Sequence, residues 1–197
     1  GEEIPVETFM LTTGTDTFTG TADADALTGV VSALSTENTF NVLDVIDGGA
    51  GEDVANISIG ANFAGFTANK GSMTNVETVN LTNTSAVSRE FDATGVKGVT
   101  KYSIDASSAA VTLKDIDALV ALEVKGQAEG KMTLAYDTAS TVVTSTTATD
   151  VQSLKLTDVG TKNTSTTATA NTKYVDFTVA KVETLNVDSQ GTGNYVD

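Results

Sequence analysis

A short segment rich in glycine and aspartate holds the residues best suited to chemistry in this chain. Residues 48–53 read Gly-Gly-Ala-Gly-Glu-Asp, and Asp44 and Asp47 precede them. Calcium is a hard cation that takes about six to eight oxygen ligands from carboxylates and backbone carbonyls. Glycines permit tight turns with positive φ, so that carbonyl oxygens turn inward while a carboxylate closes the shell. The segment therefore predicts a calcium-binding loop.

A second, less regular copy of this loop lies upstream. Residues 20–25 read Gly-Thr-Ala-Asp-Ala-Asp, which keeps the first glycine and the final aspartate of residues 48–53. The copies run into apolar positions, Leu27 in one case and the alternation of residues 55–59 in the other, which indicates strands that carry both loops into a core. Asp16 lies in a tight turn just upstream and adds a carboxylate to the same site. The alternative is a pair of ordinary turns, because Gly and Asp favour turns without any ligand.

The net charge of the chain limits the classes of partner that it is expected to bind. The 197 residues include 26 acidic and 11 basic side chains, which gives a net charge of -15. Such a surface repels phosphate backbones and anionic membranes, so we expect neither nucleic-acid binding nor membrane association. Divalent cations are its natural counter-ions, because they remove the self-repulsion that opposes a compact state. The hydrophobic content of 40%, regularly spaced, argues against disorder.

Cysteine and histidine are missing, and each of these absences excludes a class of chemistry. Without cysteine there is no disulfide framework and no thiol nucleophile. Without histidine there is no Ser-His-Asp or Cys-His triad and no histidine zinc site. No apolar run is long enough to span a bilayer. The sequence shows neither a signal peptide nor a clear end, and we interpret it as part of a longer, secreted bacterial surface protein.

A repeated apolar pattern predicts the fold. Segments with an aliphatic or tyrosine residue at the first, fourth and sixth positions begin at residues 54, 76, 99, 119, 151 and 182, at spacings of 22, 23, 20, 32 and 31 by subtraction. Shorter copies at residues 111–113, 132–134 and 177–179 lie between them. Repeats of this size are typical of solenoids, in which each coil buries its apolar edge only against its neighbours. The Thr and Val content favours strands.

We therefore predict an all-β chain folded as a right-handed parallel β-solenoid. Residues 29–43 break the pattern and are predicted to form a short helical or irregular excursion. Residues 1–60 form the calcium-binding segment, and residues 61–197 form further coils of the same continuous domain. The Thr- and Ser-rich stretches at 137–150 and 160–172 are expected to project as loops. The alternative fold is an antiparallel β-sandwich, which also has short strands at regular spacing.

Aromatic residues are expected in two kinds of position. Phe63 and Phe66 are predicted to lie in the core under a short helix. Tyr102, Tyr136 and Tyr174 are predicted to lie at strand or coil edges.

Four segments resemble bacterial surface-layer (S-layer) proteins of Gram-negative species, which are exported by type I secretion and carry RTX-like calcium loops. They are LTTGTDTFTGTADADALTG (11–29), VLDVIDGGAGEDVANISI (42–59), NVETVNLT (75–82) and VETLNV (182–187). The RTX loop itself reads G-G-x-G-x-D-x-U-x, with U a large aliphatic residue. The chain departs from the family at Asp23, Glu52 and Ala55, where the family has glycine, a small polar residue and leucine.

The resemblance implies metal ligands and a function. Asp25 and Asp53 would be side-chain ligands for Ca2+, and Asp47 an additional one. The full set of implied ligands is Asp16, Gly20, Ala22, Asp23, Asp25, Asp44, Asp47, Gly48, Ala50, Gly51 and Asp53, with the glycines and alanines acting through their carbonyls. The chain would self-associate into a calcium-dependent two-dimensional lattice on the extracellular surface. Cell-surface polysaccharide would be bound through parts of the parent protein outside this chain.

Two other functions compete with this one. A stalk or adhesin segment of a large RTX surface protein would share the calcium chemistry, but would stay monomeric when calcium is added. An enzyme is disfavoured, because the carboxylates show no recognisable catalytic spacing and the only arginine, Arg89, lies beside Glu90 and Asp92, as in a surface ion pair. We therefore expect a non-enzymatic protein with no catalytic residues and no organic cofactor.

Overall fold

The structure is a computed structural model that describes residues 7–127, 130–137, 150–160, 175–179 and 182–196, and every regular element within them is a β-strand. The strands are β1 (Thr8–Met10), β2 (Thr17–Thr19), β3 (Ala26–Val31), β4 (Val45–Asp47), β5 (Val54–Ile59), β6 (Ser72–Thr74), β7 (Thr78–Asn83), β8 (Arg89–Asp92), β9 (Val96–Lys97), β10 (Lys101–Asp105), β11 (Val111–Ile116), β12 (Ala121–Lys125), β13 (Gly130–Tyr136), β14 (Val151–Thr157), β15 (Val175–Val179) and β16 (Thr184–Gln190).

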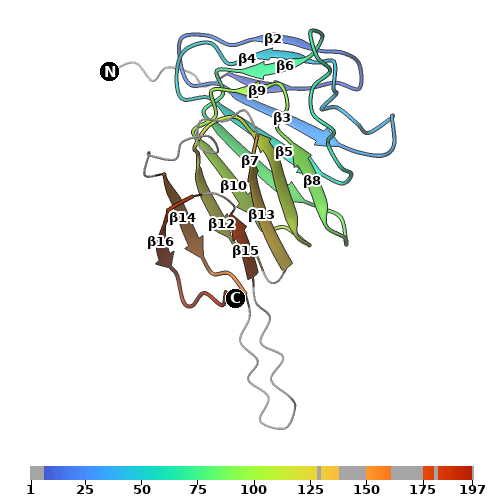
Figure 1. Ribbon diagram of the computed structural model, residues 1–197. Coiled ribbons are helices and arrows are strands. Elements are labelled where there is room, and N and C mark those ends of the chain that lie inside the picture. The colour runs from blue at the N-terminus through green and yellow to red at the C-terminus, as the bar shows by residue number, and fades with distance from the viewer. Residues whose placement is uncertain (1–6, 128–129, 138–149, 161–174, 180–181, 197) are drawn as a thin grey trace.

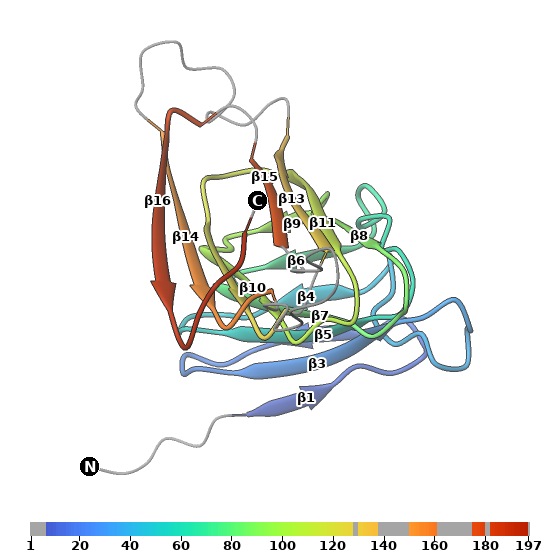
Figure 2. The same ribbon diagram turned by 90° about the horizontal axis from the view of Figure 1, so that it is seen from below.

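The strands form three sheets in which neighbouring strands are parallel. The large sheet has eight strands in the order β1-β3-β5-β7-β10-β12-β14-β16. The first small sheet has the order β2-β4-β6-β9, and the second small sheet has the order β15-β13-β11-β8. Figures 1 and 2 show the large sheet twisting from β1 to β16, with the small sheets on one side of it. The chain thus passes from the large sheet through a small sheet and back, and between β7 and β10 it passes through both small sheets; we call each such circuit a coil.

The in-register alternation of side chains builds the core. Successive side chains of a strand point to opposite faces of a sheet. On β3, β5 and β7 every second residue is buried. The pairing register places Leu27, Ala55 and Val79 in one row across the large sheet. Rows of this kind bury apolar side chains between the large sheet and the small sheets.

Aromatic rings cluster around Phe91 of β8, in the second small sheet. The ring centroids of Phe40 and Phe63 lie 4.8 Å apart, and those of Phe63 and Phe91 lie 5.1 Å apart. Phe66 contacts both Phe40 and Phe63 in edge-to-face arrangements, the geometry that the ring quadrupoles favour. Because these residues come from three different coils, the ring cluster ties segments together that are distant in sequence.

The all-β prediction with parallel strands is confirmed, whereas the alternative of an antiparallel sandwich and the helical form of residues 29–43 are wrong. The parallel pairing does not fit an antiparallel sandwich. Residues 29–43 contain no helix: β3 extends to Val31, and the amides of Thr39 and Phe40 then donate to the carbonyl of Val30 in a turn. The apolar side chains of this segment follow from the end of a strand and from Phe40, which is 1% exposed, and not from a helical face.

Some aromatic predictions also need correction. Phe63 and Phe66 are buried as predicted, but in an irregular extended segment and not under a helix. Tyr102 is 1% exposed on β10, an interior strand of the large sheet, so its predicted position at a strand or coil edge is wrong. It occupies an inward position of the large sheet, and its ring contacts Phe91. Tyr174 and most of the stretches 137–150 and 160–172 lie outside the described residues.

Candidate metal centre

The two predicted calcium loops lie on top of each other in adjacent coils. The first loop (residues 20–25) joins β2 to β3, and the second loop (residues 48–53) joins β4 to β5. Both pairs of flanking strands are aligned at a spacing of 28 residues, as in Thr19↔Asp47 and Ala26↔Val54. Backbone hydrogen bonds continue through the loops, since the amide of Gly20 donates to the carbonyl of Asp47 at 2.7 Å. Equivalent loop residues therefore face each other.

Glycine is required where the coils approach most closely. A Cβ atom at Gly20 would lie 1.9 Å from the carbonyl oxygen of Gly48. A Cβ atom at Gly48 would lie 1.8 Å from the carbonyl oxygen of Asn75 and 2.6 Å from Oδ2 of Asp53. These distances are far below van der Waals contact, so no side chain fits. The absence of side chains brings carbonyl oxygens and a carboxylate together at this corner.

The carboxylates of Asp25 and Asp53 are buried beside these glycines, with exposures of 3% and 2%. Oδ1 of Asp53 accepts the backbone amide of Asp25 at 2.7 Å, and Oδ2 of Asp25 accepts the backbone amide of Thr21 at 2.6 Å. The remaining oxygens, Oδ1 of Asp25 and Oδ2 of Asp53, are buried without a hydrogen-bond partner. A buried carboxylate oxygen without a partner is unfavourable, because its hydration has been lost and not replaced.

The electrostatics of the loops also favour a bound cation. Burial is the main cause that raises the pKa of Asp53 above its ordinary value, and the amide of Asp25 opposes it. The negative charges of Glu77, Asp25 and Glu52 raise this pKa further. A bound cation would relieve both the missing partner and the mutual repulsion of these carboxylates.

Other predicted ligands surround the same corner. Asp47 ends β4, and its Oδ1 accepts the amide of Gly49 at 3.1 Å and the side-chain amide of Asn75 at 2.8 Å. Asp23 is half-buried, and its carbonyl oxygen lies close to Gly51. Ala22 and Ala50 have exposed side chains, and the amide of Ala50 donates to the carbonyl of Thr21.

Asp16 and Asp44 lie elsewhere. They precede β2 and β4, whereas the two loops follow these strands. The carboxylate of Asp44 accepts the amides of Asp16 and Asn41 at 2.9 and 2.7 Å. The carboxylate of Asp16 accepts the amide and the hydroxyl of Thr12. All four oxygens thus have donors, and these two aspartates hold turns together instead of joining the loops.

The structure adds two residues that sequence reasoning missed. The carbonyl of Asn75 lies against Gly48, and Oε2 of Glu77 accepts the amide of Asp53 at 2.8 Å. The missed signal was positional: an asparagine and a carboxylate precede β7 just as a glycine and an aspartate precede β5. The connection from β6 to β7 lacks the glycines of the second loop, so it did not match the G-G-x-G-x-D pattern.

Side chains alone do not make a metal site here. Within the residues that the structure describes, no group of three or more His, Cys, Asp or Glu side chains is arranged to hold a metal ion. A cation at the two loops would therefore take most of its ligands from backbone carbonyls. Calcium accepts such oxygens, so the donor set fits it.

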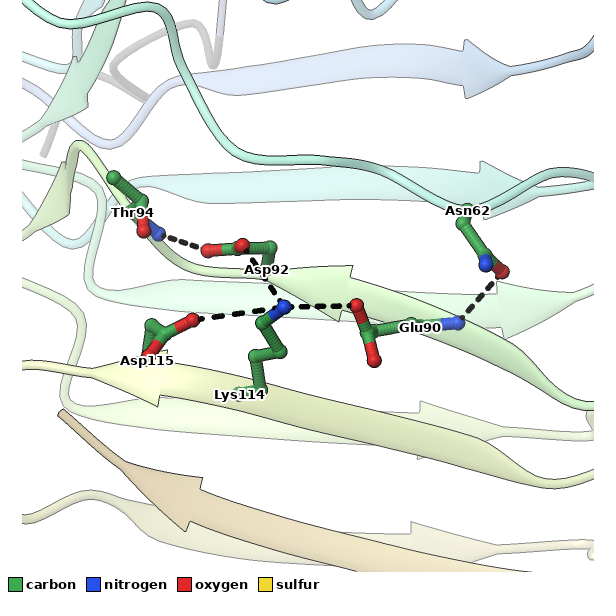
Figure 3. A network of polar contacts seen from close by, with 6 residues as sticks. All are labelled: Asn62, Glu90, Asp92, Thr94, Lys114 and Asp115. Carbon is green, nitrogen blue, oxygen red and sulfur yellow. Dashed lines mark hydrogen bonds and ion pairs between the residues drawn. The ribbon is translucent and has the colours of Figure 1, made fainter.

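A separate acidic cluster on the second small sheet already has a cation, the side chain of Lys114 (Figure 3). The Nζ atom of Lys114 lies 3.1 Å from Glu90, 3.4 Å from Asp92 and 3.8 Å from Asp115. Burial alone would raise the pKa of Asp92, but the hydrogen bonds from Thr94 and the charge of Lys114 outweigh it and lower this pKa. This cluster links β8 to β11 and does not need a metal.

Comparison of the chain with known protein families, curated proteins and solved structures found no match. Within its described part, no helix is long and apolar enough to cross a membrane. The proposals below therefore rest on the residues and the geometry of this chain.

Proposed function

We propose that this chain is a calcium-binding structural segment of a bacterial surface layer, built as a right-handed β-solenoid of the RTX-like type. The observation that carries the calcium part is that each loop holds a buried carboxylate oxygen without a hydrogen-bond partner, Oδ1 of Asp25 in the first loop and Oδ2 of Asp53 in the second. The surface-layer part is supported by the resemblance of residues 11–29 and 42–59.

The first and second loops would hold the cation. Asp25 and Asp53 would contribute carboxylate oxygens, and Gly20, Ala22, Gly48, Ala50 and Gly51 would contribute carbonyls. Calcium supplies positive charge where the buried carboxylates repel one another. The residues themselves bring these oxygens together, because the glycines let the two coils approach closely. The cation would thus fasten the first coil to the second.

The solenoid part is supported by the strand order. Each strand of the large sheet pairs in parallel with the corresponding strand of the following coil, from β1 to β16. In such a stack each coil depends on its neighbours, so a cation between two coils favours the folding of both.

Lateral assembly is the step that separates a surface-layer subunit from a stalk or adhesin segment. Calcium would reduce the net charge of -15 and with it the repulsion between copies. A surface-layer subunit should then associate when calcium is added, whereas a stalk segment should remain monomeric.

The test is thermal unfolding in EDTA and in millimolar calcium, with light scattering recorded in parallel. We expect calcium at 100–1,000 times its dissociation constant to stabilise the chain by roughly 3–4 kcal/mol. Asp53→Ala should lose most of this stabilisation. Asp117→Asn, which also removes one negative charge but at an exposed position, serves as the control and should retain it.

The outcomes separate the parts of the proposal. Stabilisation together with rising scattering supports a calcium-dependent surface array. Stabilisation of a chain that stays monomeric supports the stalk or adhesin alternative. An unchanged midpoint in calcium would show that the two loops are ordinary turns and would overturn the proposal.

A further inference from the structure

The connection from β6 to β7, in the third coil, occupies the place that the second loop occupies in the coil before it. The strands on both sides are aligned, as Asp47↔Thr74 and Val54↔Thr78 show. Residues 75–77, which we call the third turn, therefore lie over residues 48–53. From Val45 to Val54 the chain advances nine residues, and from Ser72 to Thr78 it advances six, so the third turn is three residues shorter. Asn75 has a φ of 53°, a left-handed conformation that asparagine adopts more readily than most residues.

Glu77 accepts a hydrogen bond from Asp53 in the same way as Asp53 accepts one from Asp25. The amide of Asp25 donates to the carboxylate of Asp53 at 2.7 Å, and the amide of Asp53 donates to the carboxylate of Glu77 at 2.8 Å. The carbonyls repeat in the same way: that of Gly48 lies against Gly20, and that of Asn75 lies against Gly48. Thus the coil interface after the second loop reproduces the oxygen arrangement of the interface before it.

The two unpartnered oxygens belong to different carboxylates. One is Oδ1 of Asp25, and the other is Oδ2 of Asp53. Oδ2 of Asp53 lies next to Gly48, on which the carbonyl of Asn75 also converges. Because Asp53 is 2% exposed, water does not replace the missing donor freely. The unpartnered oxygen of Asp53 and the carbonyl of Asn75 thus meet at Gly48, where the third turn lies against the second loop.

We propose that the third turn completes a second cation position between the second and third coils, with Glu77 as a side-chain ligand and Asn75 as a carbonyl ligand. The ligand class is a hard divalent cation, for which carboxylate and carbonyl oxygens are the preferred donors. This inference rests on the proposed calcium function of the first two loops and extends it by one coil. The first position lies between Asp25 and Asp53, and the second between Asp53 and Glu77.

Glu77→Gln separates a ligand from a plain hydrogen-bond acceptor. Glutamine keeps an oxygen that accepts the amide of Asp53, but it removes the negative charge that a cation needs. Glu37→Gln is the matched control: Glu37 is exposed, and its carboxylate accepts only the hydroxyl of Ser32 at 3.3 Å among the contacts described here. Asp25→Asn weakens the first position and leaves Glu77 in place.

The experiment is calorimetric titration of the chelator-treated full chain with calcium alone, with circular dichroism to verify folding. We expect two bound ions for the unmodified chain and for Glu37→Gln. Glu77→Gln should bind one of the two ions at least tenfold more weakly, and Asp25→Asn should weaken the other. If Glu77→Gln does not fold, Glu77→Asp, which keeps the charge but shortens the side chain, should show the same selective loss.

The outcomes distinguish this inference from the function on which it rests. If the unmodified chain binds no calcium, the proposed function fails and the second position fails with it. If the unmodified chain binds calcium and Glu77→Gln binds it with the same stoichiometry and affinity, the calcium function stands and the second position is overturned. Selective loss of one ion in Glu77→Gln supports the second position.

Discussion

Single residues at the coil corners have strict requirements that their sequence neighbours do not share. Gly48 must lack a side chain, because the carbonyl of Asn75 would lie 1.8 Å from its Cβ atom. Gly14 is different, since the nearest atom to its Cβ position is the hydroxyl of Thr12 at 3.6 Å, an ordinary contact. Two glycines of the same acidic region thus differ in how much they constrain the fold.

We expect Gly48→Ala to destabilise the chain by about 2–4 kcal/mol, because the backbone of one coil must move away from the next. Gly14→Ala should change the free energy of unfolding by less than about 1 kcal/mol. Urea unfolding of both variants in EDTA measures this without any contribution from calcium. Equal stabilities of the two variants would show that the coils separate easily at this corner.

The carboxylates also differ by their partners and not by their type. Asp44 and Asp53 are both fully buried, and burial raises the pKa of both. The oxygens of Asp44 both accept backbone amides, whereas one oxygen of Asp53 accepts none. Only a residue of the second kind gives a reason to expect a cation. The G-G-x-G-x-D spacing predicted Asp53 as a ligand, whereas Asp44 lies outside this pattern and only its amide donors show that both its oxygens are satisfied.

At the scale of elements, the positive charge of Lys114 holds carboxylates of the second small sheet together. We propose that calcium has the same effect in the two loops. Lys114 on β11 bridges Glu90 and Asp92 of β8 (Figure 3). Asp92 is 8% exposed, and its Oδ1 also accepts the amide of Thr94 at 2.9 Å. The cluster therefore stabilises the pairing of two strands that are distant in sequence, since Arg89 pairs with Val111.

This cluster predicts a pH dependence. The folded state lowers the pKa of Asp92, so it binds fewer protons there than the unfolded state does. The stabilisation by Asp92 is therefore present above the ordinary pKa of 3.8 and is lost as the pH falls through the lowered value. Asp92→Asn should cost about 1 kcal/mol at pH 7 and almost nothing near pH 2.

Urea unfolding of the unmodified chain and of Asp92→Asn at a series of pH values measures the difference between their free energies of unfolding. The asparagine side chain of the Asp92→Asn variant keeps an oxygen that accepts the amide of Thr94, so the comparison isolates the charge. A difference that stays constant from pH 7 to pH 2 would show that Asp92 does not act through its ionised form.

The repeat spacings of the sequence predicted most, but not all, of the pairing register of the strands. The predicted spacings of 23, 20 and 32 agree with the observed pairs Val79↔Tyr102, Tyr102↔Leu122 and Leu122↔Leu154. The predicted spacings of 22 and 31 are wrong by two residues, because Val54 pairs with Thr78 and Val151 pairs with Thr184. A shift of two residues keeps every side chain on the same face. The apolar pattern alone therefore does not distinguish the two registers.

At the scale of the whole molecule, the proposed solenoid would make stability local. Each coil pairs mainly with the coils before and after it, so a bond between two coils acts mostly on those two. The proposed cation positions lie between the first three coils, at one end of the large sheet. Removing calcium should therefore affect the two ends of the molecule unequally.

We expect hydrogen exchange to reveal this difference. Amides of β3 and β5 should be protected from exchange about tenfold less in EDTA than in calcium. The protection of amides of β10 and β12 should change by less than about twofold. Mass spectrometry of peptides from both regions gives the comparison within one sample. A uniform loss of protection along the chain would show that the coils unfold together and that the effect of calcium is not local.

Strand formation, the inward-facing residues and the two acidic loops followed from the sequence, because alternation and turn chemistry depend on neighbours along the chain. The roles of Asp44, Asn75 and Glu77 did not. Those roles depend in part on hydrogen bonds between residues 24 to 28 positions apart, which exist only once the coils are stacked in register. Tertiary structure thus decided which carboxylate oxygens accept an amide from another coil, and it left Oδ2 of Asp53 buried without a donor, because that oxygen's surroundings come from residues distant in the sequence.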